Sequence, residues 1–222
     1  MSVKPFPLYA CADIREILNR RAHGEQELLE GIEEVDEDSI YYHTHSYYMH
    51  GKYEYDLFPN DFATWVADDV RDRLLSEHLA VLDPFHFENL EALREELLTT
   101  IDDHLDRLGF SPRALSGELF HFSRARIISF PTGVTVSSRK ELGKAIRDAT
   151  PQTLFYHFFE DAFRKGTRNG SLVQWVAEDL RDQELAEGLS NFNPYRLHMD
   201  RLRTDLLSLI SGPKEGARDK HG

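Results

Sequence analysis

The chain has 222 residues, of which 41 % are hydrophobic and 29 % are charged, and this composition is typical of a globular protein with a sizeable core rather than of a disordered chain. The formal net charge of −13 argues against a nucleic-acid or anionic-membrane partner, because both bind clustered Lys and Arg. The one cysteine, Cys11, excludes an internal disulfide framework and a cysteine-rich zinc site.

Two further features concern where the protein works. No stretch approaches the roughly 18 apolar residues that a membrane span needs. The first residues, Met1 to Pro7, lack the unbroken apolar run of a signal peptide. We therefore expect a cytoplasmic protein with no membrane partner.

The hydrophobic pattern predicts helices along most of the chain. Between Glu25 and Val35 the apolar residues recur at the i, i+3, i+4, i+7 spacing of an amphipathic helix. The next stretch, 39–48, is rich in β-branched and aromatic residues, which are also common in strands. We predict a helix there, as in 151–164, where a proline stands near the expected helix start. Further helices are predicted at 61–71, 72–82 and 87–108, and from residues 171, 182 and 194 onward.

One segment departs from this helical pattern. Residues 120–133 lack good helix formers and end in the turn sequence Pro131-Thr-Gly133. We therefore allow a short strand or an extended arm near 120–130, in a fold class that is otherwise mainly α.

The sequence also contains an internal echo. The run from Trp65 to Asp72 is matched by the run from Trp175 to Asp182 at six of eight positions. We therefore predict an internally duplicated helical protein, with repeat units at 1–110 and 111–222 that pack as one globular body. Because both tryptophans stand on apolar faces, we expect both to be buried.

The same stretches resemble a known family. The run Ser39-Ile-Tyr-Tyr-His-Thr-His45, with its YHTH motif, is followed by Asn60-Asp-Phe-Ala-Thr-Trp-Val66, with an NDFxxWV motif, and by Asp83-Pro84. Together these motifs resemble a prokaryotic family catalogued as a domain of unknown function, here as two tandem copies. The resemblance covers most of both units, and it implies a helical fold and no assigned activity.

Histidines at equivalent positions are the first catalytic candidates. His43 and His157 each follow an aromatic pair, and such an imidazole can be a buried hydrogen-bonding residue, a general base or a metal ligand. We favour the structural role for both. Asp69, a repeated carboxylate, is the third candidate, whereas Asp72 and Asp182 are better explained as helix N-caps. The sequence contains no phosphate loop, nucleophile elbow or dinucleotide-binding fingerprint.

Metal-ligating residue types gather around His45 and Asp61. However, His43 and His45 point apart on a helix, and the sequence has no fixed ligand spacing such as His-Glu-x-x-His. The second copy has Phe159 and Ser171 at the equivalent positions, so any such role belongs to the first copy alone. We favour no metal site and expect no cofactor, and His45 and Asp61 are the candidate ligands if a metal is bound.

A dense run of tyrosines lies in the same region. Amphipathic aromatic rings are common where proteins bind other proteins or sugars. The candidate binding residues are Tyr41, Tyr47, Tyr48, Tyr53 and Tyr55. The run leaves a carbohydrate-binding module open as one alternative.

The two halves of the chain differ in charge. The first 110 residues carry −16 and the rest carry +3. Glu30 and Glu33 in the first half correspond to Lys144 and Arg147 in the second. Because opposed potentials promote association between protein surfaces, we expect a protein partner or self-association.

The absence of catalytic motifs favours a non-enzymatic, cytoplasmic regulatory or protein-interaction module. One alternative is an enzyme with a His/Asp site between the two repeats, which could depend on a metal. The carbohydrate-binding module is the other. No nucleic-acid partner is expected.

Overall fold

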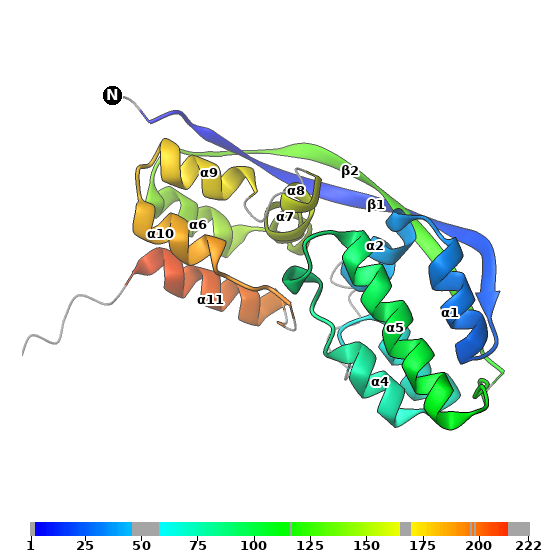
Figure 1. The fold of residues 1–222 in the computed structure, drawn as a ribbon. Coiled ribbons are helices and arrows are strands. Elements are labelled where there is room, and N and C mark those ends of the chain that lie inside the picture. Colours follow the sequence, from blue (N-terminus) through cyan, green and yellow to red (C-terminus); the bar gives the residue numbers. More distant parts are fainter. Residues whose placement is uncertain are drawn as a thin grey trace, which may run out of the picture. The chain divides into compact units, whose positions relative to one another are not determined.

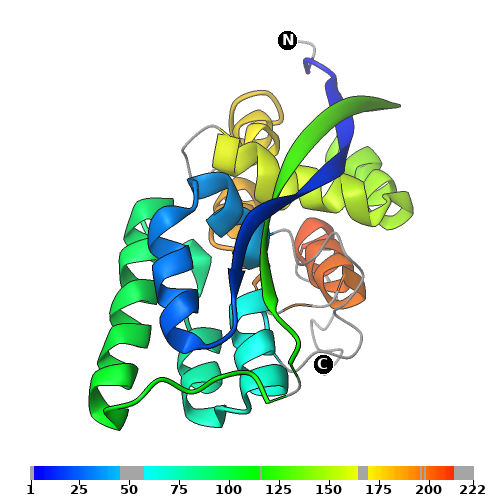
Figure 2. The same ribbon diagram turned by 90° about the vertical axis from the view of Figure 1, so that its right-hand side faces the viewer.

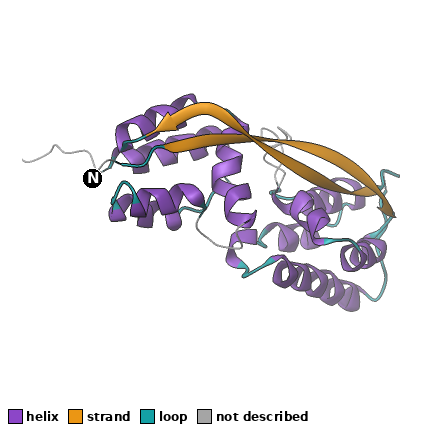
Figure 3. Ribbon diagram, turned by 90° about the horizontal axis from the view of Figure 1, so that it is seen from above, coloured by secondary structure: helices purple, strands orange, loops and turns teal. Residues whose placement is uncertain are grey.

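The computed structural model describes residues 3–45, 58–115, 117–164, 170–195, 197 and 199–212. These residues form helices and one two-stranded antiparallel sheet (Figure 1). Strand β1 is Phe6–Ala22 and strand β2 is Phe120–Val136, each of 17 residues, and Figure 3 shows the two strands running beside each other. The α-helices are α1 Glu25–Glu34, α2 Glu37–His45, α3 Asp61–Trp65, α4 Arg73–Ala80, α5 Leu90–Leu108, α6 Arg139–Asp148, α7 Pro151–Phe155, α8 Asp161–Arg164, α9 Ser171–Glu178, α10 Gln183–Ser190 and α11 Met199–Ser211. Short π-helical segments cover Val66–Val70 and Tyr156–Glu160, and a single 3-10 turn covers Pro84–His86.

The sheet corrects the predicted fold class. The prediction of a mainly α fold is wrong, because two long strands make the fold mixed α/β, and the predicted internal duplication is not evident in it. The segment near 120–130 belongs to a strand that continues to Val136. Strand β1 carries no comparable local signal, because its residues do not alternate regularly between buried and exposed.

Contacts divide the chain into two compact units. Unit 1 contains Met1–Cys11 and Ser129–Gly222, and unit 2 contains Ala12–Ile128. Unit 1 is therefore assembled from two separate stretches of chain. Each unit combines helices with one part of β1 and one part of β2, so neither consists of helices alone.

The core of unit 2 forms where α1 and α5 lie against each other (Figures 1 and 2). Leu28 and Ile32 of α1 are fully buried, as the apolar spacing of this helix predicts. Gly31 faces the ring of Phe122 in β2, and a Cβ at this position would lie 2.2 Å from a ring atom. A glycine at this position therefore allows α1 to approach the strand closely.

A buried arginine satisfies the end of α1. Arg94 of α5 donates from Nη1 to the carbonyl oxygens of Ile32, Glu33 and Val35, at 3.1, 3.2 and 2.7 Å. The last carbonyls of a helix have no partner within the helix, so a charged donor is favourable there. In unit 1, Arg203 of α11 donates in the same way to three carbonyls at the end of α6.

The core of unit 1 is built mainly on α6 and α11, which pack against each other. Its fully buried apolar residues include Leu142 and Ile146 of α6 and Leu202 and Leu206 of α11. Among the described helices, none is both long and apolar enough to cross a membrane.

The predicted N-caps are confirmed in both units. The side chain of Asp72 accepts a bond of 2.9 Å from Leu75 N–H at the start of α4. Asp182 does the same for Leu185, at 3.1 Å. Such caps satisfy amide groups that a helix start leaves without partners.

Candidate functional site

His43 connects three elements of unit 2. It lies in α2 and is buried. Its Nδ1 lies 2.8 Å from Oδ2 of Asp61, and its Nε2 accepts a bond of 2.9 Å from the backbone N–H of Ser123 in β2. Because Nε2 accepts, the ring proton lies on Nδ1 and is donated to Asp61. The ring is therefore a neutral link between helix α2, helix α3 and the strand.

Asp61, His43 and Ser123 thus lie together, as an Asp, a His and a Ser do in enzymes that use a serine nucleophile. The bond to Ser123, however, comes from its backbone amide and not from its hydroxyl. The Ser123 Oγ accepts from Nε and Nη2 of Arg15, at 3.3 and 3.2 Å. A general base must hold the hydroxyl proton of its nucleophile, so this geometry anchors a strand rather than activates a serine.

His157 anchors the other strand within unit 1. It is 3 % exposed, and its Nε2 accepts a bond of 3.0 Å from the backbone N–H of Tyr9 in β1. Its ring packs against Phe6 and Tyr156, with centroids 5.6 and 5.0 Å apart. Burial lowers the pKa of His157 to about 4, although the charge of Asp161 opposes the shift.

The remaining sequence candidates have other surroundings. Tyr41 is buried and stacks on His45, and His45 Nδ1 lies 2.8 Å from the hydroxyl of Thr44. Burial lowers the pKa of His45 to about 3. The backbone carbonyl of Asp69 accepts a bond from Leu115 N–H. Four of the tyrosine candidates lie outside the described residues: Tyr47, Tyr48, Tyr53 and Tyr55.

A second polar cluster in unit 2 was not expected from the sequence. Glu25 begins α1, Asp72 caps α4 and His104 lies on α5. His104 Nε2 lies 2.9 Å from Asp72 Oδ2 and 3.8 Å from Glu25 Oε2. Each residue places one ligand atom within 4.8 Å of the others. We call this group the Glu25–Asp72–His104 cluster, and it is the one group of at least three metal-ligand side chains found in the part of the chain that the structure describes.

Glu25 is the unusual member of this cluster. It is 0 % exposed, and neither carboxylate oxygen has a hydrogen-bond partner. Burial, with the charge of Asp72 as a smaller cause, raises the pKa of Glu25 to about 8. The sequence held one signal of this cluster. His104 lies three residues after Ile101, which places a histidine on the apolar face of helix α5. Nothing in the sequence indicates that Glu25 meets it.

Unit 1 contains an open cavity of about 550 Å³ between α10 and α11. Arg139, Glu184 and Asp205 are among its lining residues. Arg139 donates to Asp182 Oδ2 at 2.8 Å and to the Ile210 carbonyl at 2.6 Å. Its guanidinium therefore links the N-cap of α10 to the last turn of α11.

The low pKa of His157 predicts a loss of stability in acid. Unfolded histidine takes a proton near pH 6.5, whereas folded His157 resists protonation until about pH 4. Its contribution is therefore complete above pH 6.5 and is lost as the pH falls towards 4, by about 2 kcal/mol at pH 5. We expect His157→Gln, which keeps an acceptor for Tyr9, to flatten the unfolding free energy between pH 6.5 and 4 in urea titrations.

His121→Gln is the matched control for this experiment, because His121 is exposed on β2. This change should leave the pH dependence unaltered. An unchanged slope in His157→Gln would show that the buried imidazole is not a source of the acid sensitivity.

Known proteins give the fold a context. The solved structure described as "The structure of OrfY from Thermoproteus tenax" aligns over 95 % of this chain and 96 % of that chain, with a TM-score of 0.79 and 22 % identity. At this identity the likeness shows the fold alone. Curated proteins yield no significant match. The family of unknown function DUF5752 matches residues 3–211, so the chain belongs to this family.

Proposed function

We propose that the chain is a non-enzymatic protein-interaction module that associates with a second copy of itself through its β1–β2 ribbon. The observation that carries the proposal is the exposure of this ribbon. In unit 2, no side chain of residues 12–21 in β1 or of residues 124–128 in β2 is buried. Exposed apolar side chains and the outer edges of a ribbon are typical of contact surfaces.

The exposed side chains of the ribbon include large apolar groups, which stand among charged ones such as Arg15 and Glu16. In unit 2, Ile14, Ile17 and Ile128 are between 52 % and 62 % exposed. In unit 1, Phe130 and Val134 of β2 are each 45 % exposed. A two-stranded ribbon has an outer edge on each strand, and such edges pair readily with other chains.

The positions of the histidines support a non-enzymatic role. His43 and His157 both use Nε2 to accept a backbone N–H from a strand. A nitrogen whose lone pair is held in this way does not accept a proton from a substrate. Both histidines therefore support the ribbon from within the unit to which each belongs.

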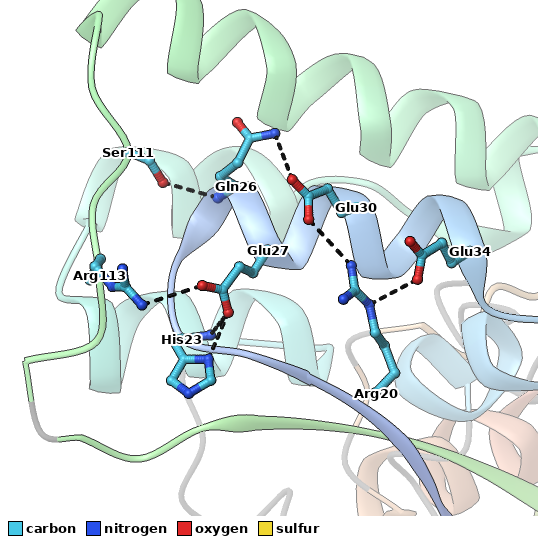
Figure 4. A network of polar contacts seen from close by, with 8 residues as sticks. All are labelled: Arg20, His23, Gln26, Glu27, Glu30, Glu34, Ser111 and Arg113. Carbon is cyan, nitrogen blue, oxygen red and sulfur yellow. Dashed lines mark hydrogen bonds and ion pairs between the residues drawn. The ribbon is translucent and has the colours of Figure 1, made fainter.

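The acidic side chains of α1 are a weaker candidate for the contact surface than the ribbon, because several of them already form ion pairs within unit 2. Figure 4 shows that Arg20 reaches Glu30 and Glu34, at 3.4 and 3.1 Å. It also shows Glu27 paired with Arg113, at 3.3 Å, and with His23. Glu27, Glu30 and Glu34 of α1 are thus already paired inside unit 2. The unequal charge of the two halves, −16 and +3, still favours approach of a second copy.

Sedimentation velocity over a range of protein concentrations tests the proposal. We expect the wild type to form a dimer that persists in 1 M salt, where the screening length is about 3 Å. The double variant Ile14→Ser/Ile17→Ser should remain monomeric. Leu74→Ser/Val81→Ser is the control, because these residues are similarly exposed outside the ribbon, and it should dimerise normally.

Two outcomes would contradict this proposal. A wild type that stays monomeric at every concentration would exclude self-association. A dimer that dissociates in high salt and is unaffected by the ribbon substitutions would instead indicate contact between the charged helix faces.

A further inference from the structure

We propose that the Glu25–Asp72–His104 cluster binds one divalent first-row transition metal ion, with Zn²⁺ as the representative. The inference is independent of the proposed self-association. It rests on the donor types, on their spacing and on the buried carboxylate of Glu25. Imidazole and carboxylate groups are common ligands of Zn²⁺, and the imidazole disfavours Mg²⁺.

The state of Glu25 points to a ligand. Its side chain is 0 % exposed, its two oxygens have no hydrogen-bond partner, and Oε2 is directed into the cluster 3.8 Å from His104 Nε2. Buried carboxylates are ordinarily paired, hydrogen-bonded or bound to a metal. A cation between Glu25 and its two neighbours would satisfy this group.

The spacing of the donors suits one small ion. Around a tetrahedral Zn²⁺ with bonds of 2.0–2.1 Å, neighbouring donor atoms lie about 3.4 Å apart. The observed separations from His104 Nε2, 2.9 Å to Asp72 and 3.8 Å to Glu25, bracket this value. Small side-chain movements would therefore bring three donors to bonding distance.

The cap of α4 prepares Asp72 for this role. Its Oδ1 accepts the N–H of Leu75 at 2.9 Å, which fixes the carboxylate and leaves Oδ2 facing His104. Hydrogen bonds that orient a ligand in this way are typical of metal sites. The Asp72 side chain is also 17 % exposed, so an ion and its remaining water ligands can enter from this side.

Binding would exchange a proton for the ion. In the hydrogen bond between His104 and Asp72, one proton lies between Nε2 and Oδ2. The ion would take the Nε2 lone pair of a ring that carries its own proton on Nδ1, and the proton shared with Asp72 would pass to solvent together with any proton on the Glu25 carboxyl. The three ligands come from the starts of α1 and α4 and from α5. A bound ion would therefore hold three helices of unit 2 together.

The test uses the full chain, first stripped with a chelator and then titrated with ZnCl₂ in a calorimeter. We expect about one Zn²⁺ per chain, a higher thermal midpoint with Zn²⁺, and no comparable effect of MgCl₂. Glu25→Gln should weaken binding by more than about 100-fold, beyond the 10–100-fold cost that is typical of changes outside the ligand set. Glu34→Gln is the control on the same helix, and it should bind as the wild type does.

Asp72→Asn keeps the test decisive if another variant unfolds, because Asn also caps a helix. This variant should fold, as judged by circular dichroism, and lose most of its affinity for Zn²⁺. Equal Zn²⁺ binding by the wild type, Glu25→Gln and Asp72→Asn would overturn the proposal, as would the absence of binding to the wild type. Because sedimentation is measured separately, either result leaves the self-association proposal to its own test.

Discussion

Truncation of either tryptophan to alanine is expected to lower the free energy of unfolding by about 3–5 kcal/mol, as for other large buried aromatic residues. Trp65 and Trp175 are both buried, as the sequence predicted. Their indole N–H groups also donate to backbone carbonyls, from Trp65 to Glu118 at 3.1 Å and from Trp175 to Lys4 at 2.7 Å. The alanine variants therefore lose both core packing and a link to the segment that precedes a strand.

Urea denaturation followed by circular dichroism measures this effect. Trp65→Phe and Trp175→Phe are the controls, because phenylalanine keeps most of the apolar volume and loses the donor. Each should cost about 1–2 kcal/mol, from the lost hydrogen bond and the smaller ring. Alanine variants as stable as the wild type would show that these side chains do not hold the cores of their units.

Replacement of His43 by phenylalanine is expected to lower the free energy of unfolding by about 3 kcal/mol, although the variant still has an aromatic ring at this position. The fully buried N–H of Ser123 loses its acceptor, and Asp61 loses the Nδ1 donor. A buried group that loses its partner costs about 1–3 kcal/mol, and bonds to charged groups lie at the upper end. Ring packing against Phe62 and Phe120, at 5.3 and 4.8 Å, should persist.

His43→Gln separates a structural role from a catalytic one. Its amide oxygen can replace Nε2 as the acceptor for Ser123, so this variant should recover about half of the lost stability in the same urea titrations. A wild-type free energy of unfolding in both variants would contradict the anchoring role, and it would revive His43 as a candidate base.

Local signals in the sequence predicted helix starts and buried helix faces, because both depend on residues that are close together in the chain. The apolar spacing of 25–35 predicted the buried face of α1, and the aspartates at 72 and 182 predicted two helix starts. The apolar surroundings of the tryptophans predicted their burial. These features depend on residues within a few positions of one another, so the sequence alone carries them.

Tertiary structure decided the sheet and the role of the histidines. The bond partners of His43 and His157 lie 80 and 148 positions away, so the sequence near each histidine does not indicate which strand it meets. The same reason hid the Glu25–Asp72–His104 cluster, whose members look locally like a helix start, an N-cap and a residue on the buried face of a helix. Only the packing of three helices brings their side chains together, and with them the site that we propose for a metal ion.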